Sequence, residues 1–176
     1  GGAAGVLGGE GLENKRTPIE FRKDRISVMP PPRPPAPPGH AVVHFKYVPE
    51  RGMRVPVQVG AVKAIGLIDT GAQVTVCNLA LREALARRRG QRDQYDDVVI
   101  GITEDIQTAA MVRIPSITAG QMIVRNAPVR FTDLHIFDHW KLTSQPALLI
   151  GMDVLGTLDT LVIDYARGEL QLRTRY

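Results

Sequence analysis

Apolar and polar residues alternate along much of the chain from Ala41 onward. Two runs carry this alternation, with apolar residues at Val43, Phe45 and Tyr47 and then at Val55, Val57 and Val59. A period of two is typical of strands with one buried face. Gly60 and Ala61 predict a turn into a return strand, Val62–Ile68, so this part of the chain is expected to form a β-hairpin.

Further β-prone runs follow to the end of the chain. They cover residues 97–101, 106–114, 122–125, 127–132, 146–150, 161–165 and 169–173. Asn126 joins the third and fourth of these runs, and Arg167-Gly168 predicts the turn of a final hairpin. A short helix is expected between Asn78, a suitable N-cap, and Gly90, which would end it. Strands therefore dominate the prediction.

The first 40 residues have a different composition. Residues 1–9 are mostly Gly and Ala, and residues 30–38 are mostly Pro, which favours extended polyproline II and cannot join the interior of a sheet. Between them, residues 18–28 contain enough apolar side chains for a short strand that docks on its own domain or on a partner, but a disordered tether is the favoured interpretation. We expect an arm or linker over residues 1–40 and one domain over residues 41–176.

An apolar run delivers one carboxylate to a turn that contains glycine. The chain reads Ile68-Asp69-Thr70-Gly71-Ala72 at this point, and a second β-prone run, residues 74–77, leaves the turn. A carboxylate at the end of a buried strand needs hydrogen-bond donors or a partner with which to share a proton. This run resembles the active-site signature of aspartic proteases in their retroviral, or retropepsin-like, form.

A second motif of that family is similar to residues 146–156. An apolar run ends at Ile150-Gly151, and Met152–Leu155 is expected to form a helical turn behind the active-site loop. Retroviral enzymes usually carry Arg at the position of Met152, so the salt bridge that buttresses their dimer is not expected here. Asp153 lies in the helical turn, for which we predict a capping or surface role. The resemblance covers residues 41–173.

The resemblance implies an all-β, single-lobe fold, a closed barrel or sandwich with one or two short helices. Because the chain has one Asp-Thr-Gly and no second copy, the active site would be completed by homodimerisation. Terminal strands in this family often build the dimer sheet. The matching residues in the flap hairpin, which folds over substrate, are Gly101, Ile102, Thr103 and Glu104.

The implied activity is hydrolysis of peptide bonds in a protein or peptide substrate. Two Asp69 carboxylates would share one proton and activate a water molecule, giving an acid-leaning pH profile. Thr70 would link the two active-site loops, while Gly71 and Ala72 would shape the floor of the site. No cofactor or metal is required. A catalytically silent dimeric module that binds peptides in the same cleft is the alternative function.

Charge and ligand chemistry bear on nucleic-acid binding and on metal binding. The formal net charge is +4, but aromatic residues make up only 5%, so we expect no nucleic acid partner. If the protein did bind a nucleic acid, the arginine cluster near residues 82–92 would form the binding surface. Residues 133–140 include two His and two Asp, residue types that bind metal ions, so a metal site must be considered there. We favour a packed loop, or one lining the substrate cleft. The single Cys77 excludes an intrachain disulfide.

The compartment follows from the resemblance alone. Bacterial members with Gly-Met-Asp, found here at residues 151–153, are often exported or membrane-anchored. We therefore expect a periplasmic or otherwise exported protein, with a membrane tether outside this chain and a cytoplasmic location as the alternative. No apolar run of about 18 residues occurs in the sequence.

Overall fold

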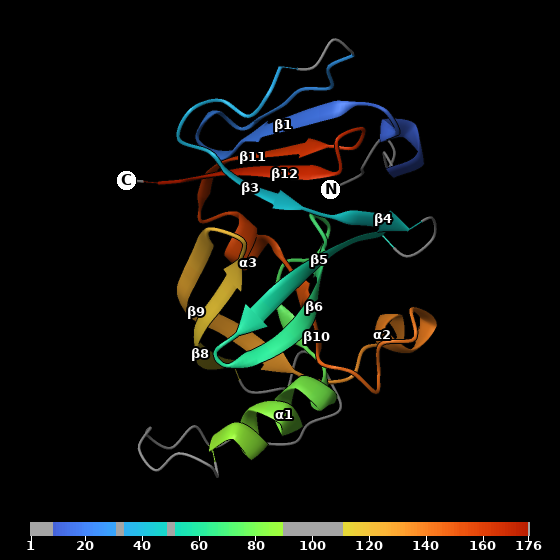
Figure 1. Cartoon of the computed structure of the whole chain (residues 1–176), viewed down its shortest axis with the longest axis vertical. Helices are drawn as coiled ribbons and strands as arrows, with labels where there is room; N and C mark the ends of the chain where they lie inside the picture. Colours follow the sequence, from blue (N-terminus) through green and yellow to red (C-terminus); the bar gives the residue numbers. More distant parts are fainter. Residues whose placement is uncertain (1–8, 31–33, 49–51, 90–110, 176) are drawn as a thin grey trace.

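The computed structural model describes residues 9–30, 34–48, 52–89 and 111–175. The strands of this part of the chain form two sheets (Figure 1). The strands are β1 (Arg16–Glu20), β2 (Arg25–Ile26), β3 (Ala41–His44), β4 (Lys46–Val48), β5 (Gly52–Val59), β6 (Val62–Ile68), β7 (Val76–Cys77), β8 (Met111–Ala119), β9 (Met122–Phe131), β10 (Ala147–Ile150), β11 (Leu158–Asp164) and β12 (Glu169–Thr174). The helices are α1 (Leu79–Arg89), α2 (His135–His139) and α3 (Met152–Leu155), with 3₁₀ turns η1 (Gly9–Leu12) and η2 (Phe21–Lys23).

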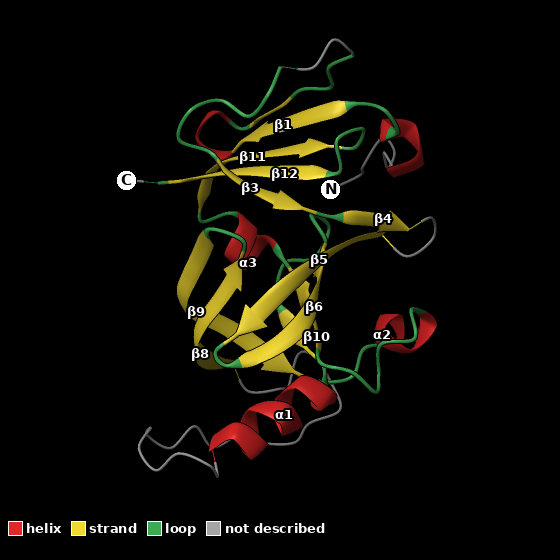
Figure 2. Ribbon diagram, in the orientation of Figure 1, coloured by secondary structure: helices red, strands yellow, loops and turns green. Residues whose placement is uncertain are grey.

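The larger sheet closes on itself. Its strand order is β4-β5-β6-β10-β7-β9-β8, and β5 also pairs with β8 through Gln58 opposite Thr118 and Val59 opposite Ile117. The ring of β5, β6, β10, β7, β9 and β8 is therefore a closed barrel, with β4 extending from β5. Figure 2 shows that strands dominate the molecule and that α1 covers the end of the barrel farthest from the smaller sheet. The single-lobed barrel expected from the sequence is confirmed.

Alternation along β5 and β6 places one set of side chains inside the barrel. Val55, Val57 and Val59 of β5 are buried, whereas Pro56 and Gln58 between them are exposed. The same core continues into the smaller sheet, where Val43 and Leu170 are buried in one cluster with the barrel residues. Burial of apolar surface thus joins the two sheets as one body.

The smaller sheet has the order β2-β1-β11-β12-β3. The predicted C-terminal hairpin, β11 and β12, lies at its centre. β1 pairs with β11 and β3 pairs with β12, so both edges of the hairpin are occupied by strands of the same chain. The hairpin is thus paired on both sides within this chain, and a sheet that terminal strands build with a second copy stays a prediction.

β1 and β2, joined by η2, pair within the chain, so the tether interpretation of residues 18–28 was wrong for this part of the arm. The Arg16 side chain is buried, and its guanidinium donates to Gln171 Oε1 at 2.8 Å and to the Pro34 carbonyl. Backbone hydrogen bonds also join Arg16 to Met29 in both directions, at 3.1 and 2.8 Å. A buried arginine thus connects β1 with the proline-rich segment and with β12.

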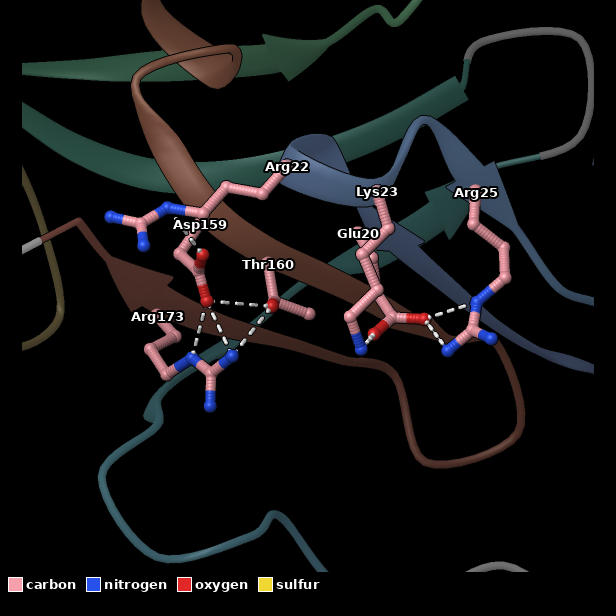
Figure 3. Close-up of polar contacts among 7 residues, drawn as sticks. All are labelled: Glu20, Arg22, Lys23, Arg25, Asp159, Thr160 and Arg173. Atoms are coloured by element: carbon pink, nitrogen blue, oxygen red, sulfur yellow. Dashed lines mark hydrogen bonds and ion pairs between the residues drawn. The ribbon is translucent and has the colours of Figure 1, made fainter.

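Surface ion pairs surround the docked arm (Figure 3). Arg22 of η2 pairs with Asp159 of β11 at 3.2 Å, and Asp159 also accepts from Arg173 Nε at 2.7 Å. The hydrogen bond from Arg173 is the main cause that lowers the pKa of Asp159 below its ordinary value. The guanidinium of Arg22 is exposed, so we attribute the docking of the arm mainly to the β1–β11 ladder and to Arg16.

Asn78 caps α1, as the sequence predicts. Its Oδ1 accepts from the Leu81 N–H at 2.9 Å and from the Ala147 N–H at 3.0 Å. Its Nδ2 donates to the carbonyls of Leu142 and Gln145 at 2.9 and 2.8 Å. This fully buried amide therefore joins the helix, the segment before β10 and β10 itself.

Three local details differ from the sequence prediction. The runs on either side of Asn126 are one strand, β9, in which Asn126 has φ +52°. β8 continues past Ile114, where the expected run ended, through Pro115 to Ala119, and it pairs with β9. α2 was not predicted, because five residues cannot display a helical period.

We predict that Asn78→Ala lowers the free energy of unfolding by about 3 kcal/mol, because it removes four side-chain hydrogen bonds to backbone groups, three of them buried. Urea denaturation measures this loss. Gln58→Ala is the control, since the Gln58 amide makes one exposed hydrogen bond, to the Gly60 carbonyl, and should change stability by no more than about 0.5 kcal/mol. Equal effects of the two substitutions would contradict the prediction.

Candidate active site

The Asp69 loop, residues 69–75, is positioned by strand β10. β10 pairs in parallel with β6, which enters the loop, and antiparallel with β7, which leaves it. The loop therefore crosses the carboxyl end of β10. Ile68 lies opposite Ile150, and the Asp69 N–H donates to the Ile150 carbonyl at 3.1 Å. The Asp-Thr-Gly turn and the Ile150-Gly151 motif, about 80 residues apart in sequence, are thus neighbours in space.

The loop backbone orients the Asp69 carboxylate. Asp69 Oδ1 accepts a hydrogen bond from the Gly71 N–H at 2.8 Å, and the Asp69 carbonyl accepts from the Ala72 N–H at 3.3 Å. A Cβ on residue 71 would lie 3.2 Å from Asp69 Oδ1, so a side chain there would crowd the carboxylate. Asp69 is half-buried in the single chain, and Thr70 and Gly71 are exposed. The carboxylate is therefore both fixed and accessible.

The loop passes Gly151 at very short range. A Cβ on residue 151 would lie 2.6 Å from the Val74 carbonyl oxygen and 2.9 Å from that of Ala72, so only glycine fits without a shift of the backbone. Directly after this glycine, the Met152 N–H donates to the Ala72 carbonyl at 2.8 Å. The Asp153 N–H donates to the Gln73 carbonyl at 3.2 Å. The start of α3 is thus bonded to the middle of the loop.

Asp153 does more than the capping or surface role predicted for it, since its Oδ1 accepts from the Val154 N–H of α3 and its carboxylate also binds Thr75. Its Oδ1 accepts from the Thr75 hydroxyl at 2.7 Å, and its Oδ2 accepts from the Thr75 N–H at 2.9 Å. Thr75 Oγ1 in turn accepts from the Gly151 N–H at 3.1 Å. Thr75 is fully buried, and the N-cap of α3 is Gly151, without a side-chain cap. These contacts form a polar link between α3 and the end of the loop.

The structure brings together most of the residues proposed from the sequence. Asp69, Thr70, Gly71 and Ala72 form the turn, and Ile150 and Gly151 lie directly behind it. The flap residues Gly101, Ile102, Thr103 and Glu104 lie outside the described residues. Sequence reasoning missed Thr75 as a member of the site. The available signal was one polar residue shortly after each motif, Thr75 and Asp153, in otherwise apolar surroundings.

Residues 133–140 form a packed segment beside the loop. Phe137 is fully buried in a cluster with Leu67 and Val76, against which Ala72 and Val74 of the loop also pack. Arg54 of β5 donates to the Trp140 carbonyl at 3.0 Å. Among the described residues, no three His, Cys, Asp or Glu side chains are grouped as metal ligands. Residues of this segment thus support the Asp69 loop through apolar contacts.

The reactivity of the single cysteine, Cys77, follows from its burial. Cys77 is buried at the end of β7, and burial, with the charge of Asp153, raises the pKa of its thiol. The thiol therefore stays protonated and unreactive.

In the described parts of the chain, no helix has both the length and the apolar character needed to cross a membrane.

Comparison with known proteins identifies one family. The sequence model of the aspartyl protease family matches residues 55–154, which include the Asp69 loop and the whole second motif except its last residues. No curated protein sequence matches the chain. A solved structure of a retropepsin-like aspartic protease from Rickettsia conorii is similar, with 19% identity, a TM-score of 0.47, and coverage of 76% of this chain and 89% of that one. Basic 7S globulin from soybean is similar at 11% identity and a TM-score of 0.38, covering 78% and 43% of the two chains.

We predict that Gly151→Ala lowers the free energy of unfolding by about 3 kcal/mol, because its Cβ would collide with two backbone carbonyls that cannot move independently. Thermal and urea denaturation measure the change. Gly71→Ala is the control in the same loop, since its Cβ meets only the Asp69 side chain, at 3.2 Å, and we expect a loss below about 1 kcal/mol. A Gly151→Ala variant as stable as wild type would contradict the close approach.

Proposed function

Because this chain belongs to the aspartyl protease family, we propose that it is an endopeptidase of the retropepsin-like form that acts as a homodimer through Asp69. One observation carries the proposal. The Asp69 carboxylate lies at the end of a barrel strand, held by the Gly71 N–H, in an intact and exposed Asp-Thr-Gly turn. A fixed and accessible carboxylate is what an acid–base catalyst needs.

The need for a second copy follows from the number of carboxylates. The chain contains one Asp-Thr-Gly, and the second carboxylate that the described residues place beside this loop, Asp153, uses its oxygens to accept hydrogen bonds from Thr75. A second copy placed on a two-fold axis would supply a second Asp69. The exposed Thr70 would then be available to contact the loop of the partner.

The proposed reaction is direct attack by water. Two like charges close together cannot both ionise cheaply, so the pair of Asp69 carboxylates shares one proton. The ionised member accepts a proton from water while the protonated member donates a hydrogen bond to the scissile carbonyl. Water oxygen bonds to the carbonyl carbon, the C–N bond then breaks, and the leaving nitrogen takes up a proton from the dyad. No covalent bond forms between the enzyme and the substrate.

Other residues of the loop would bind rather than react. Gly71 and Ala72 leave room for an extended peptide to approach the floor of the site, where a side chain at residue 71 would crowd Asp69. We retain Gly101, Ile102, Thr103 and Glu104 as the proposed flap, and an exported location as the proposed compartment. Both rest on the family resemblance.

We predict that Asp69→Asn reduces cleavage by about 10³-fold or more, because an amide cannot accept the proton of water. Cleavage of a diverse peptide mixture between acid and neutral pH, read by mass spectrometry, measures this. Asp24→Asn is the control, since Asp24 is exposed on the arm and Asn tolerates its φ of +45°. Full activity of Asp69→Asn would refute the assignment, and peptide binding without turnover by dimeric wild type would favour the silent binding module.

We predict that Asp69→Asn chains inactivate the wild-type chains with which they pair, because a mixed dimer has only one catalytic carboxylate. After the two proteins are mixed in equal amounts and allowed to exchange subunits, activity per wild-type chain should fall to about half. As the control, an equal amount of Asp24→Asn protein is added instead. Because every chain in that mixture keeps Asp69, activity divided by the total number of chains should not fall. Unchanged activity after proven subunit exchange would mean that each chain acts alone.

A further inference from the structure

We propose that Thr75 and Asp153 are positioning residues that hold the Asp69 loop in its reactive geometry, an inference that rests on the proposed function. We call their three contacts the Thr75–Asp153 bridge: Thr75 N–H to Asp153 Oδ2, Thr75 hydroxyl to Asp153 Oδ1, and Gly151 N–H to Thr75 Oγ1. Neither side chain needs to touch substrate. The bridge acts on Asp69 through the backbone.

The bridge fixes the end of the loop that is farther from Asp69. Thr75 is fully buried, and its hydroxyl both donates and accepts, so its rotamer is defined by two hydrogen bonds. Asp153 is half-buried in α3. Hydrogen bonds that involve a carboxylate in such a site are stronger than those between neutral groups. The two residues therefore form a stiff connection between the loop and α3.

A short covalent and hydrogen-bonded path leads from the bridge to the carboxylate. Thr75 Oγ1 holds the Gly151 N–H, and the carbonyl of the preceding residue, Ile150, accepts from the Asp69 N–H at 3.1 Å. Between these two points, the Ala72 and Gln73 carbonyls accept from the first N–H groups of α3. The loop is thus attached to one backbone turn at its start, its middle and its end. Loosening the end would let the whole turn shift.

The charge on Asp153 is used for hydrogen-bond acceptance. Its Oδ1 accepts from the Thr75 hydroxyl and from the Val154 N–H at 2.9 Å, while Oδ2 accepts from the Thr75 N–H. An amide offers one acceptor oxygen, and its NH₂ would face a donor at one of these positions. Asn at residue 153 would therefore keep the size of the side chain but break one arm of the bridge.

Small displacements of a catalytic group have large kinetic effects, since a shift of about 1 Å can cost about 10²-fold in rate. We predict that Thr75→Val and Asp153→Asn lower kcat by about tenfold, with KM within about threefold of wild type. Thr75→Ser retains the hydroxyl and should keep at least about one third of kcat. Steady-state kinetics on a peptide cleaved by wild type measures each value, at a temperature where every variant is shown to be folded.

Thr157→Val provides the matched control for stability. The Thr157 hydroxyl follows the other end of α3 and donates to the Val154 carbonyl at 2.7 Å. This variant loses one hydroxyl hydrogen bond of the same helix and should keep wild-type kcat. A kcat loss in Thr157→Val as large as that in Thr75→Val would replace the positioning role with a general effect on α3.

The outcomes separate this inference from the function on which it rests. Wild-type kcat in a folded Thr75→Val variant would overturn the inference and leave the proposed function intact. Equal loss in Thr75→Ser and Thr75→Val would also overturn it, because the hydroxyl would then not be the group that acts. Wild-type protein without any cleavage that depends on Asp69 would overturn the proposed function and the inference together.

Discussion

Close contact between two backbone segments determines the arrangement of the site. The Asp69 loop crosses Gly151 with no room for a Cβ, and this approach allows the N–H groups that follow Gly151 to reach the loop carbonyls. β10 pairs with the strand on either side of the loop, so the barrel itself forces the crossing. Burial on both faces of β10, in which all four residues are buried, keeps this strand in place. The geometry of the Asp69 loop is thus a consequence of sheet closure.

Local signals explain which parts of the fold were predictable from the sequence. Alternation identified β5 and β6, and a capping amide identified the start of α1, because both signals depend on neighbouring residues. Residues 16–28 gave no such signal. Proline and charge within β1 suggest an unstructured segment, and only β11, near the other end of the chain, provides its pairing partner. Long-range pairing therefore overrode local composition.

The same distinction applies to the candidate site. The two motifs containing Asp69 and Gly151 were found because each has a recognisable local sequence, and the structure places them in contact. The pairing of Thr75 with Asp153 was missed, because a threonine after a turn and an aspartate in a helical turn each have an ordinary local explanation. Only tertiary contact distinguishes a surface carboxylate from one that is bonded to the Asp69 loop.

The position of β1 also has a consequence for how the chain folds. Arg16 lies opposite Asp164, so β1, which is synthesised before the other described strands, pairs with one of the last to be made. Loop closure of this length is entropically costly and slow, whereas the β5–β6 and β8–β9 hairpins form from adjacent segments. We infer that the barrel assembles first and that the arm docks after the C-terminal hairpin has emerged from the ribosome. Until the arm docks, the edge of β11 that β1 later covers would be open to pairing with another chain.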